Sequence, residues 1–131
     1  MANGYQSREI DPVPTSGLNS TGAEIPKGTI VARGAGETIT VAGTDTAVLL
    51  GVTGEDIPNG SYGRVVTRGV VPVIFSAAQT VGVRVTAAAN GKAQAATTGD
   101  SVLGITREVG AADTLAEVEL AGPGGGAAPV I

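Results

Sequence analysis

The chain has 131 residues and a formal net charge of −4, and it contains neither cysteine nor histidine. This length corresponds to one compact domain, and the missing residue types exclude disulfides, ordinary zinc or copper sites, and nucleophiles that depend on a histidine base. Basic residues are few and scattered, which argues against a nucleic-acid partner, and no apolar run reaches the roughly 18 residues of a membrane-spanning helix.

β-Branched residues dominate the composition: 25 valines and isoleucines and 15 threonines stand against 7 leucines and methionines. Because these side chains hold χ1 stiffly and pack well on a pleated surface, the composition predicts an all-β fold. The apolar content is thin, since burying a valine or leucine contributes only about 1.5–3 kcal/mol while ordering a residue costs about 1.5 kcal/mol. We therefore expect a subunit interface or a larger assembly to supply part of the stability.

Residues 1–24 contain several prolines and glycines and little periodicity, and they predict an extended N-terminal arm. Two interpretations stay open: a floppy terminus, or an arm that becomes ordered against a partner. In the second case spaced apolar residues would be its anchors, namely Tyr5, Ile10, Val13 and Leu18.

From Ile25 onward the pattern changes to short strands separated by turns. Strands are predicted at residues 29–33, 37–42, 47–53, 62–68, 70–75, 81–86, 92–96, 101–106 and 114–120. Asn59-Gly60 and Asn90-Gly91 are typical hairpin turns, and Pro72 implies a sheet edge or a bulge. Residues 76–80 are the one place where a short helix is plausible.

This strand spacing predicts a small β-sandwich or a partly open β-barrel of β-tulip-like form. Residues 25–121 would form the β-rich domain, with the arm of residues 1–24 before it. Residues 122–131 are rich in glycine, proline and alanine and predict a flexible tail.

Residues 49–69 and 101–122 carry a repeated phrase at an offset of 53. The identical pairs are Leu50/Leu103, Gly51/Gly104, Thr53/Thr106, Glu55/Glu108, Val65/Val118 and Gly69/Gly122. Val52/Ile105 and Tyr62/Leu115 are apolar in both copies, and we expect each pair to face a common core. The phrase predicts two related β-units folded onto one another, and chance similarity is the alternative.

Candidate chemistry is sparse. Glu55, Asp56 and Glu108 lie in predicted turns, where paired carboxylates could perform glycoside chemistry if a cleft held them about 5–10 Å apart, although solvated turn acids are the simpler interpretation. Lys27 and Lys92 also lie in turns, where a solvated amine is expected rather than a Ser–Lys pair. A calcium site using Asp45, Asp56 or Asp100 lacks the regular spacing of oxygen ligands.

Three stretches carry a family resemblance: TDTAVLLGVTGEDI (44–57), VGVRVTAAANGKAQAAT (81–97) and GDSVLGITREVGAADTLAEVEL (99–120). They are similar to the small capsid decoration, or cement, proteins of tailed bacteriophages. The closing cadence of that group is matched by Gly99, Asp100, Leu103, Gly104, Ile105, Val118, Glu119 and Leu120. The resemblance covers roughly residues 25–122 and includes no reactive group.

The resemblance implies a structural protein of the virion that binds the outer surface of the phage head. Such proteins commonly form homotrimers and bridge subunits of the major capsid protein, and an N-terminal arm can become ordered on the capsid. Our own hypothesis for the residues is that the arm contacts the capsid through Tyr5, Arg8, Ile10, Val13 and Leu18, and that the trimer forms through Val71, Val73 and Phe75. The protein would be made in the host cytoplasm and located on the exterior of the capsid.

The resemblance carries over no catalytic residue, and together with the composition it leads us to expect no enzymatic activity, cofactor, metal, nucleic-acid partner or membrane partner. The alternative function is a virion-surface adhesin or a carbohydrate-binding module. Such a module needs an exposed aromatic side chain, and Tyr62 in the first copy of the repeated phrase is the candidate.

Overall fold

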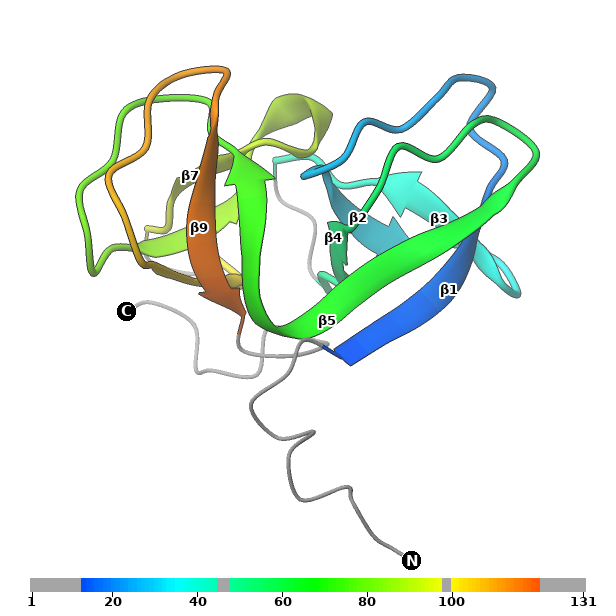
Figure 1. The fold of residues 1–131 in the computed structure, drawn as a ribbon, viewed down its shortest axis with the longest axis horizontal. Coiled ribbons are helices and arrows are strands. Elements are labelled where there is room, and N and C mark those ends of the chain that lie inside the picture. The colour runs from blue at the N-terminus through cyan, green and yellow to red at the C-terminus, as the bar shows by residue number, and fades with distance from the viewer. Residues whose placement is uncertain (1–12, 45–47, 98–99, 121–131) are drawn as a thin grey trace, which may run out of the picture.

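The computed structural model describes residues 13–44, 48–97 and 100–120 (Figure 1). The strands are β1 (Val13–Asn19), β2 (Ile30–Arg33), β3 (Thr38–Val41), β4 (Gly51–Thr53), β5 (Tyr62–Ile74), β6 (Arg84–Ala87), β7 (Ala93–Ala95), β8 (Gly104–Thr106) and β9 (Leu115–Leu120). The short turn η2 (Ala89–Gly91) joins β6 to β7, and its Asn90 has a left-handed backbone with φ of 63°. The all-β prediction is confirmed. Within the described residues, no helix is long and apolar enough to cross a membrane.

The N-terminal unit is a closed barrel of five strands in the order β1-β3-β2-β4-β5, and pairing of β1 with β5 completes the ring. All neighbouring pairs are antiparallel except β1 and β3, which run parallel at Leu18–Thr38 and Asn19–Ile39. Closure leaves few unpaired main-chain groups at strand edges. This barrel forms the right-hand lobe of Figure 1.

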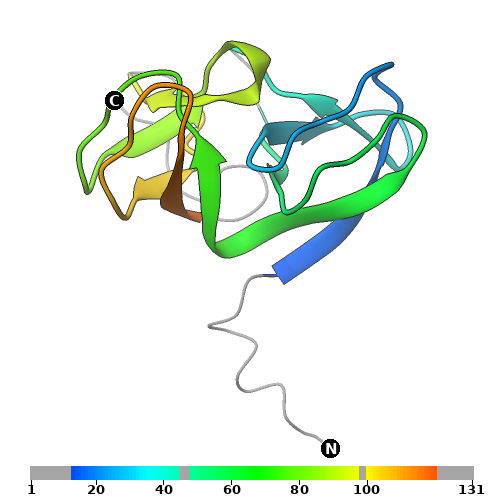
Figure 2. The same cartoon turned by 45° about the horizontal axis from the view of Figure 1, so that its top comes forward.

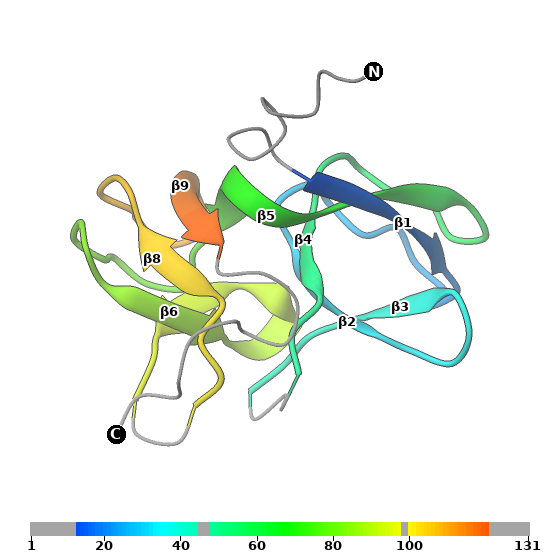
Figure 3. The same cartoon turned by 90° about the horizontal axis from the view of Figure 1, so that it is seen from below.

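The C-terminal unit repeats this arrangement with strands β5-β9-β8-β6-β7. A single parallel bridge between Phe75 and Ala93 joins the end of β5 to β7, at the place where Asn19 and Ile39 pair in the first barrel. The second unit is therefore a more open version of the first. It forms the other lobe when the molecule is seen from below (Figure 3).

Strand β5 belongs to both units. Its first half pairs with β1 and β4, and its second half, from Gly69 to Ile74, pairs with β9 (Figures 1 and 2). The sequence predicted two strands here, and the structure joins them through Gly69, whose φ of +95° is readily adopted by glycine. The two lobes are thus linked by one bent strand instead of a loop.

The repeat extends well beyond the phrase visible in the sequence. The offset is 53 residues between β4 and β8 (Gly51 to Gly104) and 54 residues between β2 and β6 (Val31 to Val85). Loop contacts are repeated too, because the bridge between Ile25 and Ile57 corresponds to that between Gln79 and Gly110.

The shared Gly51 and Gly104 are explained by the close approach of a neighbouring strand. A Cβ atom on Gly51 would collide with the carbonyl oxygen of Val66, and one on Gly104 would collide with that of Glu119. Glycine at both positions therefore permits the neighbouring strand to come close. The shared Val65 and Val118 are fully buried in their respective units.

The apolar pairs of the phrase do not all face a core. Val52 is fully buried, but its counterpart Ile105 is 44% exposed, and both Tyr62 and Leu115 are exposed. Val52 lies on the side of its unit that packs against the other lobe, whereas Ile105 has no second lobe to cover it. The expectation of a common core is therefore wrong for Ile105, Tyr62 and Leu115.

Two apolar clusters form the interior. The smaller one fills the first barrel and contains Ile25, Val31, Ile39, Ile57 and Val65. The larger one crosses between the lobes, since it joins Ile30, Val52 and Val66 of the first unit to the side chains of the second. The lobes consequently share the larger cluster, while the first barrel also has the smaller one.

Val71, Val73 and Phe75 belong to this larger core and are at most 4% exposed. Alternate residues of β5 point to the same side, and for these three that side is the interior of the second unit. They are therefore covered by their own chain, which corrects their assignment to trimer contacts.

Two further expectations are corrected. Residues 76–80 form bends and a bridge instead of a short helix, because Ser76 N–H donates to Ala93 O and Gln79 exchanges main-chain bonds with Gly110. Residues 13–24 are not a separate arm, because β1 pairs with β5 inside the chain and Asn19 is fully buried.

Candidate functional site

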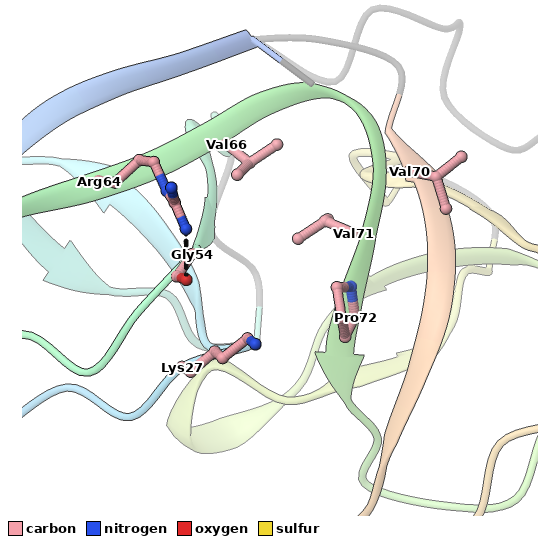
Figure 4. Close-up of a pocket in the computed structure, with 7 residues that line it drawn as sticks. All are labelled: Lys27, Gly54, Arg64, Val66, Val70, Val71 and Pro72. Atoms are coloured by element: carbon pink, nitrogen blue, oxygen red, sulfur yellow. Dashed lines mark hydrogen bonds between the residues drawn. The ribbon is translucent and has the colours of Figure 1, made fainter. Parts of the chain in front are cut away.

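A cleft of about 370 Å³ lies in the concave side of the bend of β5, between the two lobes (Figure 4). Its lining is cationic and apolar and includes no acidic residue; the lining residues are Lys27, Gly54, Arg64, Val66, Val70, Val71 and Pro72. Lys27 and Arg64 come from the first unit, while Val70, Val71 and Pro72 come from the second half of β5. The cleft exists because one strand serves two barrels.

Lys27 is held by a loop that contacts both lobes. Its main-chain N–H donates to Asp56 Oδ1 at 2.8 Å, and Gly28 N–H donates to Thr53 O at 3.0 Å. From the second unit, Ile74 N–H donates to Gly28 O at 2.9 Å. Three hydrogen bonds therefore hold the main chain from which the Lys27 side chain extends.

Arg64 is fixed in the first half of β5. Its guanidinium Nη2 donates to Gly54 O at 2.9 Å, its main-chain N–H donates to Glu55 Oε2 at 2.9 Å, and Gly54 N–H donates to Arg64 O at 2.9 Å. The side chain is exposed, as is that of Lys27. Among the described residues, neither cation forms an ion pair.

The apolar side of the cleft consists of β5 residues on both sides of the bend at Gly69. Val66 and Val71 are at most 6% exposed, whereas Val70 is 36% exposed. Figure 4 shows Lys27 and Arg64 on one side of the space and Val71 and Pro72 on the other. The cleft can thus present positive charge and apolar surface to the same ligand.

The acids considered for catalysis have structural partners. Glu55 Oε2 accepts from Arg64 N–H and Glu108 Oε1 accepts from Glu117 N–H, at 2.9 and 2.8 Å, in equivalent positions of the two units. Asp56 binds the Lys27 main chain. Glu55 and Glu108 thus cap the start of a strand, and none of the three carboxylates lines the cleft.

The shared threonines act in the same structural way. Thr53 Oγ1 donates to Pro26 O at 2.7 Å and accepts from Thr29 N–H at 3.0 Å. Thr106 Oγ1 likewise donates to Thr80 O at 2.6 Å and accepts from Val83 N–H at 2.9 Å. The repeated phrase therefore preserves a set of main-chain contacts.

The remaining candidates are dispersed. Lys92 forms an ion pair with Asp113, and Asp100 Oδ2 accepts from the N–H and hydroxyl of Thr97. Asp45 lies outside the described residues. In the part of the chain that the structure describes, no three acidic side chains gather into a possible metal site.

Tyr62, the residue of the adhesin alternative, is 58% exposed on β5. The adjacent Glu37 raises the pKa of its hydroxyl above 10.0, through a hydrogen bond and through its negative charge. Phe75 is buried, so within the described ranges no second aromatic ring accompanies Tyr62 at the surface.

The residues predicted for the arm fall into two groups. Tyr5, Arg8 and Ile10 lie outside the described residues, while Val13 and Leu18 lie in β1 and use main-chain bonds within the first barrel.

Sequence reasoning missed the cleft. It treated Lys27 as a solvated turn amine and gave Arg64 no role. The alignment at an offset of 53 did contain a signal, because Arg64 stands opposite Glu117 in an otherwise similar phrase.

Comparisons with known proteins agree with this fold. The chain resembles the N base of the head fiber protein gp8.5 of bacteriophage phi29, with a TM-score of 0.67 and 18% identity over 82% of this chain and 92% of that one. No curated protein matches the chain. The family model described as phage cement protein matches residues 15–120.

That match includes both barrels and the cleft between them, and it confirms the resemblance found in the sequence. The chain therefore belongs to the phage cement protein family and is a structural protein of the virion.

Proposed function

We propose that the protein binds the outer surface of the phage head and stabilises the capsid by bridging subunits of the major capsid protein, as a homotrimer. The observation that carries this proposal is the family match over residues 15–120, which includes all of the described domain except its first two residues.

The shape of the molecule supports a bridging role. The two lobes share β5 and the larger apolar cluster, so a force applied to one lobe is transmitted to the other without passing through a flexible linker. Each lobe can then contact a different capsid subunit. Many such contacts, each of modest free energy, add up over a closed shell and oppose its opening.

The chemistry of the surface also supports adhesion. The acids of the repeated phrase cap strands, and no metal cluster is found among the described residues. Several apolar side chains are exposed at loop ends of the second lobe, including Val109 at 71% and Val81 at 59%. Exposed apolar groups of this kind are suited to contacts with protein neighbours.

The test is to mix purified protein with undecorated heads and to image them by cryo-electron microscopy. Ordered, stoichiometric density that contacts two or more capsid subunits is the expected result, together with a trimer mass in sedimentation equilibrium. Heads that stay bare would refute head binding. A monomer mass in sedimentation equilibrium, together with single copies in the density on the head, would refute the trimer. Saturable glycan binding lost in Tyr62→Ala would instead support the adhesin alternative.

The arm is tested separately. Residues 13–18 complete the first barrel, so the truncation must stop before Val13. Deleting residues 2–12 is expected to abolish head binding, because Tyr5, Arg8 and Ile10 are removed, while the melting temperature stays within a few degrees of the full chain. Unchanged occupancy on heads would refute the arm's role.

A further inference from the structure

The cleft between the lobes carries positive charge that the fold does not require. Lys27 and Arg64 extend into it, no acidic side chain lines it, and neither cation is paired among the described residues. This positive site occurs on a chain whose net charge is −4. A positive concave site on an acidic protein favours a ligand with negative charge.

The internal repeat shows that the cations are not needed to build the barrel. In the second unit the positions of Lys27 and Arg64 are occupied by Val81 and Glu117, at offsets of 54 and 53. The main-chain contacts are nevertheless the same, since Gly28 N–H to Thr53 O corresponds to Gly82 N–H to Thr106 O, each at 3.0 Å. The fold thus tolerates either set of side chains.

The second unit also neutralises the charge that it has at the equivalent place. Arg107, which corresponds to Gly54, pairs with Glu119 at 2.9 Å, and Glu119 corresponds to Val66. The first unit has two cations that form no ion pair among the described residues and lie beside apolar side chains. The second unit has instead an ion pair between two of its own residues. Only the first unit therefore offers charge to a partner at this position.

Main-chain geometry limits how a partner can bind. Ile74 N–H points across the cleft edge to Gly28, and alternate residues of a strand direct their main-chain groups to the same side. Pro72 lies on that side and has no N–H to donate. A partner cannot add here as a regular strand, so side-chain chemistry must supply the recognition.

We infer that the cleft binds an extended segment of the major capsid protein in which a carboxylate side chain lies beside an apolar one. The carboxylate is placed between the Lys27 ammonium and the Arg64 guanidinium, and the apolar side chain covers Val70 and Pro72. This inference rests on the proposed function, and it identifies one of the contacts through which the head is bound.

Binding to heads tests the inference with variants that the second unit already justifies. Lys27→Val and Arg64→Glu introduce the residues found at the equivalent positions, and Arg84→Glu is a matched charge reversal on the exposed surface of β6. The double variant is expected to bind undecorated heads about tenfold more weakly or worse, with the loss shrinking at high salt. Arg84→Glu is expected to bind like the wild type.

The outcomes separate the two proposals. If wild-type protein does not bind heads, the proposed function fails. If the wild type binds and the double variant, folded by circular dichroism, binds equally well, the cleft inference fails while the proposed function stands. Equal weakening by Arg84→Glu would also overturn the inference, because it would show a general charge effect.

A zero-length crosslinker identifies the occupant. Treatment of decorated heads with a carbodiimide is expected to join Lys27 Nζ to an aspartate or glutamate of the major capsid protein, detected by mass spectrometry and absent in Lys27→Val. Crosslinks from Lys27 only to another copy of this chain, or no Lys27 crosslink on well-occupied heads, would overturn the inference.

Discussion

Replacing Thr53 by valine tests the physical meaning of the repeated phrase. The substitution keeps the shape of the side chain but removes the hydroxyl that accepts from Thr29 N–H at 3.0 Å and donates to Pro26 O at 2.7 Å. Pro26 O retains a second donor, the Thr29 hydroxyl, at 2.7 Å. The main loss is therefore the acceptor for Thr29 N–H.

The magnitude follows from burial. Thr29 is 3% exposed and Thr53 is fully buried, so water cannot easily replace the missing acceptor. A buried donor left without a partner costs about 1–3 kcal/mol, and we expect Thr53→Val to lower the free energy of unfolding by about 2 kcal/mol. In the second unit Val83 N–H is only partly buried, so Thr106→Val should cost about 1 kcal/mol.

Urea denaturation followed by circular dichroism measures both losses under two-state conditions. Thr40→Val, on the exposed face of β3, is the control and is expected to change stability by less than about 0.5 kcal/mol. If Thr53→Val is as stable as the control, or if Thr106→Val is the more damaging of the two, the assignment of the shared threonines to main-chain support is wrong.

Three other predictions use the same structure. Gly51→Ala should prevent folding, because its Cβ would meet the carbonyl oxygen of Val66, whereas Gly43→Ala, with open space around it, should express as soluble protein; equal yields would contradict the close approach. Phe75→Ala should lower the free energy of unfolding by about 3–5 kcal/mol, since the ring is fully buried, and a change confined to trimer affinity would contradict its place in the core. Glu37→Gln should lower the pKa of Tyr62 toward 10.0, because the carboxylate stabilises the neutral phenol, and an unchanged phenolate absorbance titration would contradict this contact.

Local chemistry explains what could be predicted. The Asn90-Gly91 turn requires a backbone that these two residues adopt readily, and both have positive φ in the hairpin between β6 and β7. Gly51 and Thr53 recur as Gly104 and Thr106 because each pair performs the same main-chain task. Such requirements are short-range, so they are visible as a repeated string.

The cleft could not be predicted in the same way. Lys27 and Arg64 are ordinary exposed cations in the sequence, and they become a site only because β5 bends at Gly69 and brings a second barrel against the first. The sequence also did not show which face of β5 is buried beyond the bend. Alternation shows that Val71, Val73 and Phe75 share a face, but not whether that face packs inside the chain or is exposed to a partner.

The sequence by itself determined the all-β fold, the hairpin turns and the similarity of the two phrases, because side-chain shape and backbone preference act over a few residues. Tertiary structure alone decided that β1 is the first strand of one unit and the second half of β5 the equivalent first strand of the other, although the two segments share almost no residue identity. It also decided that one strand would serve two barrels. Those outcomes depend on long-range pairing, where hydrogen bonds join main chains regardless of the side chains they carry.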